Sequence, residues 1–337
     1  MATHELPTRI LAAPKAELHL HLEGSIRPQV AVKLAARHGV ALTEDDVRRQ
    51  YAYTNFTEFI EAFKWVTSFL RDPADFALIA ADLAEQLLAQ KVSYAEVTLS
   101  VGVMLLRKQN PQANFEALLA ATVPFERKGL RLNWIYDAVR QFGPDLAQEV
   151  VDWAKQCNSS RIVAFGIGGD ELSGETKDFK RVYERATACG LHRLIHAGEI
   201  GGPEKIREAV ELLGVERIGH GIAAIHDRAL MDLLAARRIV LEICPASNLL
   251  TGALAAQLRR TAPSIREHPL PRLVRHGIPV VLSTDDPSMF HTSLREEYQH
   301  AHDMGLGEVE LAQLVENGFS FSFLSEDERN RLNFRTA

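Results

Sequence analysis

Short apolar stretches alternate with longer amphipathic stretches along this chain. Eight stretches rich in Val, Ile and Leu have the length of buried strands, and they cover residues 17–22, 93–100, 130–139, 162–169, 192–198, 216–221, 240–245 and 280–286. Between them, apolar residues recur every three or four positions, which is the spacing of helices that bury one face. Such helices are expected at residues 75–90, 145–156, 177–189, 203–213 and 228–236.

This alternation predicts an α/β fold. Parallel strands joined by helices, in eight units within 337 residues, favour a closed (β/α)8 TIM barrel, with an open sheet as the alternative. The first two strand-like stretches are separated by about 70 residues, which is too long for one crossover. Extra helices are therefore expected between the first and second strands, including one at residues 55–70 over the mouth of the barrel. A single domain is expected over residues 1–337, with a barrel core at about 14–332.

Composition and charge exclude several classes of protein. The 38 Lys and Arg residues are interspersed with 44 Asp and Glu residues, for a net charge of -6, so no basic face is available for nucleic acid. No stretch approaches the roughly 18 to 20 apolar residues of a membrane span. Three cysteines without C-x-x-C spacing are typical of a reducing compartment. Residues 1–15 offer only a short apolar patch at 10–13, and Glu5 lies where a secretory signal has positive charge, so a cytoplasmic protein with a small-molecule partner is expected. The oligomeric state is left open.

Candidate chemistry lies where the predicted strands end, because barrel enzymes place their active sites at the C-terminal ends of the strands. His19 and His21 are two positions apart on a strand, so both rings lie on one face and can share a metal. A half-buried structural pair is the alternative. His196 ends the fifth strand and Asp285 ends the eighth. Together with His19 and His21 they form a ligand set of three imidazole nitrogens and one carboxylate. This set predicts one catalytic Zn²⁺ per chain, although Fe(II), Co(II) and Mn(II) accept the same ligands.

Three further residues follow strands at the same mouth. Glu199 is placed for general acid–base work next to an activated water, with a helix cap or a solvated turn as the alternative. His220 lies between two glycines, where it either orients the water or is a core histidine. Asp286 points away from Asp285 in an ideal strand, so both reach the site only if the strand bends before them.

Four motifs in this order resemble the adenosine deaminase family of the amidohydrolase superfamily. They are PKAELHLHLEG at residues 14–24, HAGE at 196–199, RIGHG at 217–221 and STDDP at 283–287. The resemblance extends over nearly the whole chain.

The resemblance implies an activity and a role for each candidate. His19, His21, His196 and Asp285 would be the zinc ligands. Water would add to C6 of a purine, ammonia would leave and a 6-oxopurine would remain. The other roles implied are Glu199 as the proton shuttle near N1, His220 beside the attacking oxygen, Asp286 facing N7, Gly169 as the backbone contact to N3 and Glu23 near the ribose 5′-hydroxyl.

The substrate within the family depends on two features that point in different directions. Residues 169–171 (GDE) and 248–254 (NLLTGAL) look like the nucleoside deaminases, so adenosine and 2′-deoxyadenosine are the expected substrates and free adenine is a weaker alternative. Glu23, however, stands where that branch has Asp, and residues 97–104 (VTLSVGVM) lack the usual Arg and Pro. The relative that acts on 6-amino-6-deoxyfutalosine, with its bulky 5′ extension, is therefore the alternative.

The same barrel is also compatible with a different class of enzyme. Two-metal hydrolases of esters or cyclic amides bridge their metals with a carboxylated lysine, and the fourth predicted strand here ends in Gly-Gly-Asp-Glu without one. A non-catalytic binding protein would lack a ligand or the acid–base residue, and none is missing.

Overall fold

Eight parallel strands, hydrogen-bonded in the order of the sequence, form the centre of the computed structural model, which describes residues 5–331. The strands are β1 (Lys15–His21), β2 (Val92–Leu99), β3 (Arg131–Val139), β4 (Ile162–Gly168), β5 (His192–Ala197), β6 (Arg217–His220), β7 (Val240–Ile243) and β8 (Val280–Leu282). The predicted TIM barrel is confirmed, although β8 ends at Leu282 and not at residue 286. Residue 332, the last of the expected core, lies outside the described residues.

The barrel is closed between its first and last strands by the chain that follows β8. Asp285 pairs with Leu20 in a single parallel bridge. Its amide donates to the carbonyl of His19 at 3.0 Å, and its carbonyl accepts from the amide of His21 at 2.8 Å. The amide of Thr284 donates to the carboxylate of Glu17 at 3.1 Å. The seam therefore lies at the C-terminal ends of the strands, where the predicted site is located.

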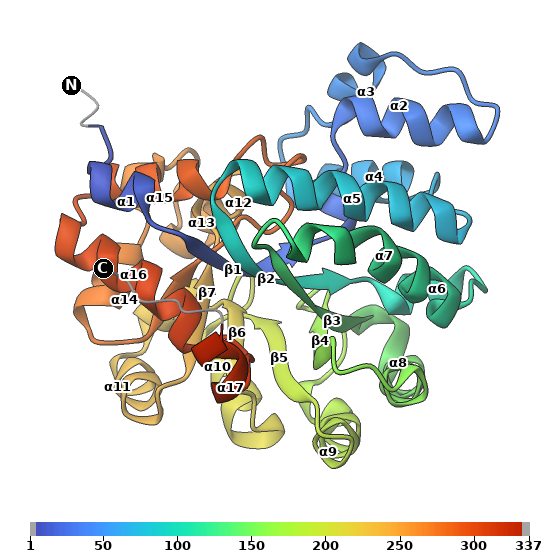
Figure 1. Cartoon of the computed structure of the whole chain (residues 1–337). Coiled ribbons are helices and arrows are strands. Elements are labelled where there is room, and N and C mark those ends of the chain that lie inside the picture. The colour runs from blue at the N-terminus through green and yellow to red at the C-terminus, as the bar shows by residue number, and fades with distance from the viewer. Residues whose placement is uncertain (1–4, 332–337) are drawn as a thin grey trace.

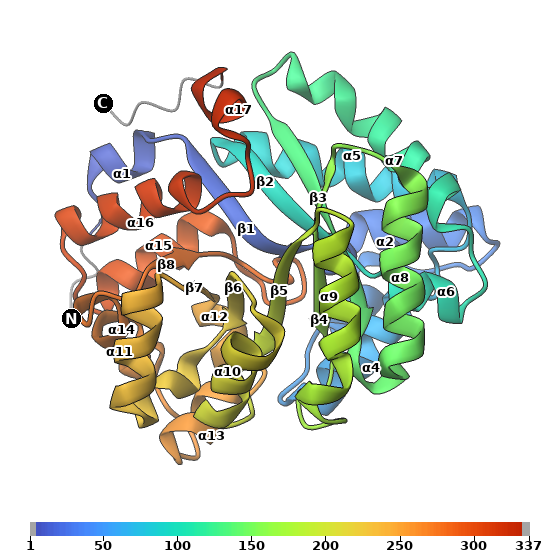
Figure 2. The same ribbon diagram turned by 90° about the horizontal axis from the view of Figure 1, so that it is seen from below.

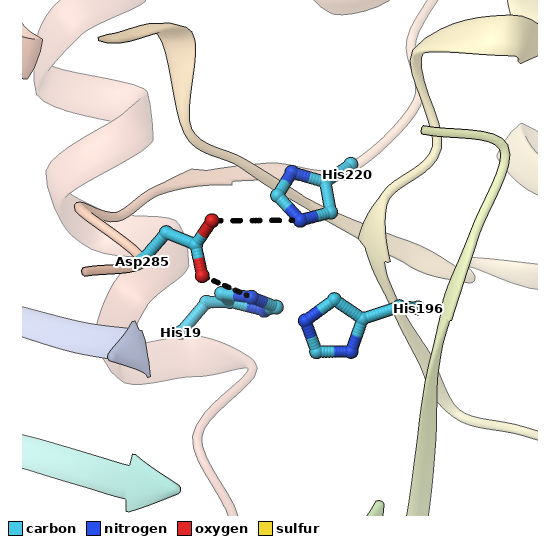
Figure 3. Close-up of side chains that lie close together, drawn as sticks. All are labelled: His19, His196, His220 and Asp285. Atoms are coloured by element: carbon cyan, nitrogen blue, oxygen red, sulfur yellow. Dashed lines mark ion pairs between the residues drawn. The ribbon is translucent and has the colours of Figure 1, made fainter. Parts of the chain in front are cut away.

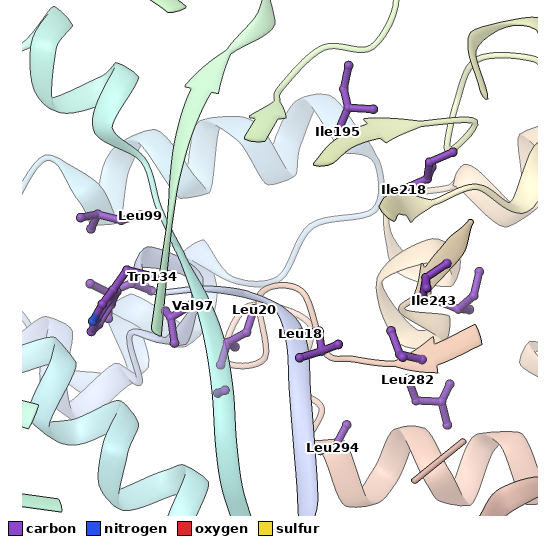
Figure 4. Packing of buried hydrophobic residues seen from close by; sticks show 14 of the residues in the cluster. Leu18, Leu20, Val97, Leu99, Trp134, Ile195, Ile218, Ile243, Leu282 and Leu294 are labelled. Carbon is purple, nitrogen blue, oxygen red and sulfur yellow. The ribbon is translucent and has the colours of Figure 1, made fainter. Parts of the chain in front are cut away.

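Side-chain alternation along the strands separates an apolar outer layer from a polar interior. Leu18, Leu20, Ile218 and Ile243 belong to the hydrophobic cluster between the strands and the surrounding helices (Figure 4). The intervening positions include Glu17 and His19 on β1, Arg217 on β6 and Glu242 on β7, and all four side chains are buried. In many TIM barrels these inner positions hold branched apolar residues, so this interior is polar to an unusual degree.

Helices surround the strands, as Figures 1 and 2 show from two directions. After β2 they are α6 (Val101–Leu106), α7 (Pro111–Glu126), α8 (Gly143–Cys157), α9 (Lys180–Ala188), α10 (Pro203–Glu208), α11 (Arg228–Arg237), α12 (Pro245–Leu250), α13 (Ala253–Leu258), α14 (Leu270–Arg275), α15 (Leu294–Asp303), α16 (Glu308–Ser320) and α17 (Glu326–Arg331). Shorter turns are η2 (Arg140–Phe142), η3 (Thr176–Phe179), η5 (Ile222–His226), η6 (Ile265–Glu267) and the π-helical η4 (Ala209–Leu213). The helices predicted after β3, β4, β5 and β6 are confirmed.

The long connection between β1 and β2 contains the expected extra helices. They are η1 (Glu23–Ser25), α2 (Pro28–Arg37), α3 (Glu44–Gln50), α4 (Phe56–Thr67) and α5 (Pro73–Ala89), and α1 (Thr8–Ala12) precedes β1. Asn55 starts α4 as its N-cap, because its side chain accepts the amide of Glu58 at 3.0 Å. One face of α4 lines the central cavity, whereas α2 and α3 lie at the edge of the molecule (Figure 1). Among the described residues, no helix is long and apolar enough to span a membrane.

Candidate active site

Four side chains from different parts of the barrel converge at the C-terminal ends of the strands (Figure 3). They are His19 on β1, His196 on β5, His220 on β6 and Asp285 in the loop after β8. Their nitrogen and oxygen ligand atoms all lie within 4.8 Å of one another. Asp285 joins the group through both oxygens, with Oδ1 3.4 Å from His19 Nε2 and Oδ2 3.8 Å from His220 Nε2.

His21 lies at the edge of this group. Its Nε2 is 3.3 Å from Asp285 Oδ1, and its ring centroid is 5.4 Å from that of His196. The structure thus brings the predicted ligands together, but the tight group contains His220 in place of His21. Because both rings present a nitrogen to Asp285, the ligand set His19, His21, His196 and Asp285 stays a prediction.

The burial and chemistry of the group fit a divalent metal. His19 Nε2 is buried and makes no hydrogen bond, which costs free energy unless another partner takes the nitrogen lone pair. Burial lowers the pKa of His220 to about 3, so its imidazole is neutral and keeps a lone pair as well. Three imidazoles and one carboxylate are donors that suit Zn²⁺. The described residues therefore contain a buried His/Asp metal site.

His220 and Asp285 hold strained backbone conformations, with φ of 62° and 64° respectively. Residues other than glycine rarely adopt this left-handed region, and such strain concentrates at functional sites. At Asp285 the hydrogen bonds to β1 hold the conformation. The chain has already left the strand at this point, so Asp285 and Asp286 both line the cavity. The sequence predicted that Asp285 and Asp286 could both reach the site only if the strand bends before them, and the chain bends there.

A carboxylate inside the barrel orients His19. Glu242 Oε2 lies 2.7 Å from His19 Nδ1. The neighbouring Arg217 lowers the pKa of Glu242 despite its burial, so this carboxylate is ionised and only accepts. His19 therefore carries a proton on Nδ1, and Nε2, which faces the centre of the site, is the nitrogen available to a metal.

Sequence reasoning missed this part of the site. Arg217 is fully buried and forms ion pairs with Glu242 at 2.7 Å and with Glu96 at 2.5 Å. The signal in the sequence is a single charge inside an apolar strand, as with Glu242 in Val-Leu-Glu-Ile. Nothing in the sequence, however, indicates which strands face one another across a barrel.

Residues 321–323, which follow α16, cover the side of the Arg217 ion-pair network that lies away from His19; we call this side the floor of the barrel. Arg217 donates to the carbonyl of Phe321 at 3.1 Å, and its guanidinium stacks 3.7 Å from the ring centroid of Phe323. The Phe323 ring also stacks on His192, with centroids 4.0 Å apart. The amide of Phe323 donates to Glu96 at 2.5 Å. Residues 321–323 thus hold the far side of the network that orients His19.

Helix α12 supports the other two members of the group. Ser247 donates to Asp285 Oδ2 at 2.7 Å, and Asn248 Nδ2 lies 3.0 Å from His220 Nδ1. Asn248 Oδ1 in turn lies 3.2 Å from His268 Nε2. His220 is therefore more than a packed core histidine, because its inner nitrogen has a side-chain partner and its outer nitrogen faces Asp285.

Glu199 lies beside the group and lines the cavity. Its Oε2 is 3.7 Å from His220 Nε2, and Oε1 accepts from the hydroxyl of Thr251 at 3.4 Å. Burial, with the charges of Asp285 and Glu171, raises the pKa of Glu199 to about 8. The helix-cap alternative does not hold, because Gly202 is the N-cap of α10. A buried carboxyl that is protonated near neutral pH is suited to proton transfer.

The turn that carries Glu199 is held by a second carboxylate. Glu171 accepts from the amides of residues 199, 200 and 201 at 2.9 to 3.0 Å, and also from the amide of Gly198. Gln257 donates to the carbonyls of Glu199 and Gly201, both at 2.9 Å. In the sequence, Glu171 was noted only as part of the GDE stretch that looks like the nucleoside deaminases. In the structure it fixes the position of the turn that carries Glu199.

Asp286 and Gly169, the residues expected to contact N7 and N3, both line the wall of the cavity. Burial and the adjacent Asp285 hold the pKa of Asp286 well above its usual range. Asp286 packs so closely on Gly24 that a Cβ at residue 24 would lie 1.7 Å from its Oδ1. Gly169 has a φ of 92°, which brings its backbone into the wall without a side chain.

Glu23 does not line the main cavity. It is buried, its Oε1 accepts from the amide of Ser100 at 3.0 Å, and its Oε2 has no hydrogen-bond partner. It faces a small adjacent cavity of about 10 Å³ that Arg107 also lines. The carboxylate therefore lies behind the wall in this conformation.

The main cavity has a volume of about 300 Å³ and extends well beyond the histidine cluster. Its wall away from the cluster is mostly apolar and includes Phe56, Phe59, Ile60, Phe63, Val103, Leu106, Val139 and Phe142. In the part of the chain that the structure describes, Lys64 is the one lysine of the lining, and it is exposed on α4. A lysine that bridges two metals at the cluster is thus not found there.

Comparisons with known proteins agree with this geometry. Residues 14–335 match the family model described as adenosine deaminase. An aminodeoxyfutalosine deaminase of Streptomyces coelicolor is 36% identical over 335 residues, which cover 97% of this chain and 84% of that protein. An adenine deaminase of Chelativorans sp. is 33% identical and covers 94% of this chain and 96% of its own. The solved structure of an amidohydrolase from Burkholderia ambifaria with bound Zn matches with a TM-score of 0.88 at 25% identity, over 99% and 93% of the two chains.

The metal site predicts a stoichiometry. We expect about one divalent metal per chain by elemental analysis, because the four ligand side chains surround a single position. His196→Ala and Asp285→Ala should lose most of the metal. His226→Ala, at an exposed histidine outside the group, should keep it. Two metals per active chain would contradict this prediction.

The contact between Glu242 and His19 predicts an effect on metal affinity. We expect Glu242→Gln to weaken metal binding about 10- to 100-fold, since a neutral amide no longer fixes the ring of His19. Competition with a chromogenic chelator measures the affinity. Glu216→Gln, at a half-exposed carboxylate next to β6, is the matched control. Native affinity in Glu242→Gln would show that Glu242 only stabilises the fold.

Proposed function

This chain belongs to the adenosine deaminase family and is a deaminase, and we propose that its substrate is a 6-aminopurine nucleoside with a large 5′ substituent, namely 6-amino-6-deoxyfutalosine. The observation that carries this choice is the extent of the cavity. Its apolar wall on α4 and α6 lies beyond the residues expected to contact the purine, and a plain nucleoside would leave it unfilled. The 36% identity to an aminodeoxyfutalosine deaminase supports the same choice.

The position of Glu23 also supports a 5′-extended substrate. The resemblance implies that Glu23 lies near the ribose 5′-hydroxyl of a plain nucleoside. In the structure the carboxylate is turned to the amide of Ser100 and is not part of the cavity lining. An extension at the 5′ position therefore has room.

The proposed chemistry assigns a role to each side chain of the site. His19, His21, His196 and Asp285 would hold one Zn²⁺, with His220 in reach of the same group. Bound there, Zn²⁺ supplies Lewis acidity that makes a water molecule a nucleophile near neutral pH. Glu199, which is protonated near neutral pH, donates its proton to N1 of the purine while His220 orients the attacking oxygen, and the proton of the added hydroxyl group moves to the departing amine. Asp286 and the backbone of Gly169 hold the ring at N7 and N3, and ammonia leaves from C6.

Adenine is a second candidate substrate because several relatives of 31 to 33% identity are adenine deaminases. A free base would occupy only the part of the cavity beside Asp286 and Gly169. Adenosine, the substrate expected from the sequence, would fill more of the cavity than adenine but less than a nucleoside with a large 5′ substituent.

The proposed substrate predicts an order of kcat/KM values. We expect 6-amino-6-deoxyfutalosine to be deaminated with the highest kcat/KM in a panel with 5′-methylthioadenosine, 5′-deoxyadenosine, adenosine, 2′-deoxyadenosine and adenine. The panel is measured by ammonia release on the metal-loaded enzyme. A higher kcat/KM for adenine or adenosine would refute the proposed substrate but leave the deaminase chemistry intact.

The role of Glu199 predicts a separation of metal binding from turnover. We expect Glu199→Gln to keep its metal and lose at least about 10²-fold in kcat, because the amide has similar size but no proton to transfer. Glu204→Gln, at an exposed carboxylate on α10 nearby, should keep both. Loss of metal from Glu199→Gln would make Glu199 a ligand or a structural residue instead.

A further inference from the structure

The wall of the cavity on α4 and α6 combines aromatic surface with two cationic side chains. Cavity-lining positions 56, 59, 60, 63, 64 and 67 have helical spacing, so one face of α4 forms this wall. Phe56, Phe59 and Phe63 supply its aromatic surface. Lys64 lies on the same face, and Arg107 lies directly after α6. We call this region the α4–α6 arm. Deamination at C6 uses none of its residues.

Arg107 is half-buried in the arm, and within residues 5–329 it forms no ion pair with a carboxylate. Its guanidinium donates to the carbonyl of Thr67 and, at 3.0 Å, to the hydroxyl of Thr67. Glu23 attracts it electrostatically from across the small adjacent cavity. Arginine binds carboxylates and phosphates through pairs of charge-assisted hydrogen bonds. A guanidinium that is partly desolvated and bonded only to neutral oxygens is suited to an anionic ligand.

Lys64 is available at the rim of the same arm. Its ammonium pairs with Glu61 at 2.8 Å, but both side chains are about two-thirds exposed, at 62% and 67%. A surface pair of this kind contributes little free energy. Lys64 is therefore free to turn to an anion in the arm at little cost.

We propose that Arg107, assisted by Lys64, binds a carboxylate at the end of the 5′ substituent, and that the phenylalanines of α4 pack on the apolar part that carries it. This inference rests on the proposed function and adds a specificity determinant to it. A phosphate would be as complementary as a carboxylate to the positive charges of Arg107 and Lys64. The aromatic surface beside the cations favours an anion carried on an apolar group over a phosphate bonded directly to the 5′ carbon, because a bare phosphate would leave that surface unfilled.

The test compares an acid with its uncharged counterpart. The metal-loaded enzyme is assayed with 6-amino-6-deoxyfutalosine and with its methyl ester, which has nearly the same size but no charge. We expect the native enzyme to prefer the acid. Arg107→Gln should lower the acid-to-ester ratio of kcat/KM about 10- to 100-fold, mainly through KM. Lys64→Gln should lower this ratio about 2- to 5-fold. Lys108→Gln, at an exposed cation that does not line the cavity, is the matched control and should leave the ratio unchanged.

The outcomes separate this inference from the proposed function. Deamination of acid and ester with equal kcat/KM, and with no change in Arg107→Gln, would overturn the carboxylate site while the proposed substrate class stands. Deamination of neither compound by an enzyme active on adenosine or adenine would refute the proposed function itself. A preference for adenosine 5′-monophosphate over adenosine that Arg107→Gln removes would replace the carboxylate with a phosphate. Because Arg107 also joins α6 to α4, its variant is checked for native metal content and unfolding temperature, and Lys64→Gln repeats the test at an exposed position.

Discussion

Inside the barrel, the guanidinium of Arg217 lies between the carboxylates of Glu96 and Glu242, and all three side chains are fully buried. Burying ions costs several kcal/mol for each ion unless close opposite charges offset it. The three strands that carry these residues must therefore keep their relative positions within a narrow range. His19 is bonded to one end of this network, so the orientation of its ring follows from the same constraint. A core of branched apolar residues would tolerate small shifts that this interior does not.

The two sides of the cavity differ in how many hydrogen bonds fix their side chains. Around the histidine group, several side chains are held by a second residue: Asp285 by Ser247, His220 by Asn248, and the turn of Glu199 by Glu171. The opposite wall is one face of a helix with large apolar side chains and few specific bonds. Fixed positions suit the reacting atoms, whereas an apolar wall accommodates differences in the rest of a substrate.

Sequence reasoning located the strands and the candidate residues because both leave local signals. Buried strands appear as short apolar runs, and polar residues at their ends mark the mouth of a barrel, as with His196 and Asp285. The supporting residues leave no such signal. Arg217 and Glu96 are distant in sequence and meet only because β2 and β6 face the same interior. The tight grouping of His220 in place of His21 depends on the left-handed backbone at His220, which a pattern of residue types does not reveal. The early end of β8 has the same origin, since the bend at Asp285 replaces the last residues of the strand.

Because residues 321–323 contact the ion-pair network behind His19, the site can be completed only late in the synthesis of the chain. A chain leaves the ribosome from its N-terminus, so His19 emerges among the first residues. Its partner Glu242, the ion pairs behind Glu242, and the Phe323 ring that stacks on Arg217 emerge progressively later. The seam at Asp285 also waits for the end of the barrel. The histidine group therefore cannot reach its final geometry during most of translation. A nascent chain carries loose imidazoles without a finished pocket, and selective capture of metal is postponed until nearly the whole chain has been synthesised.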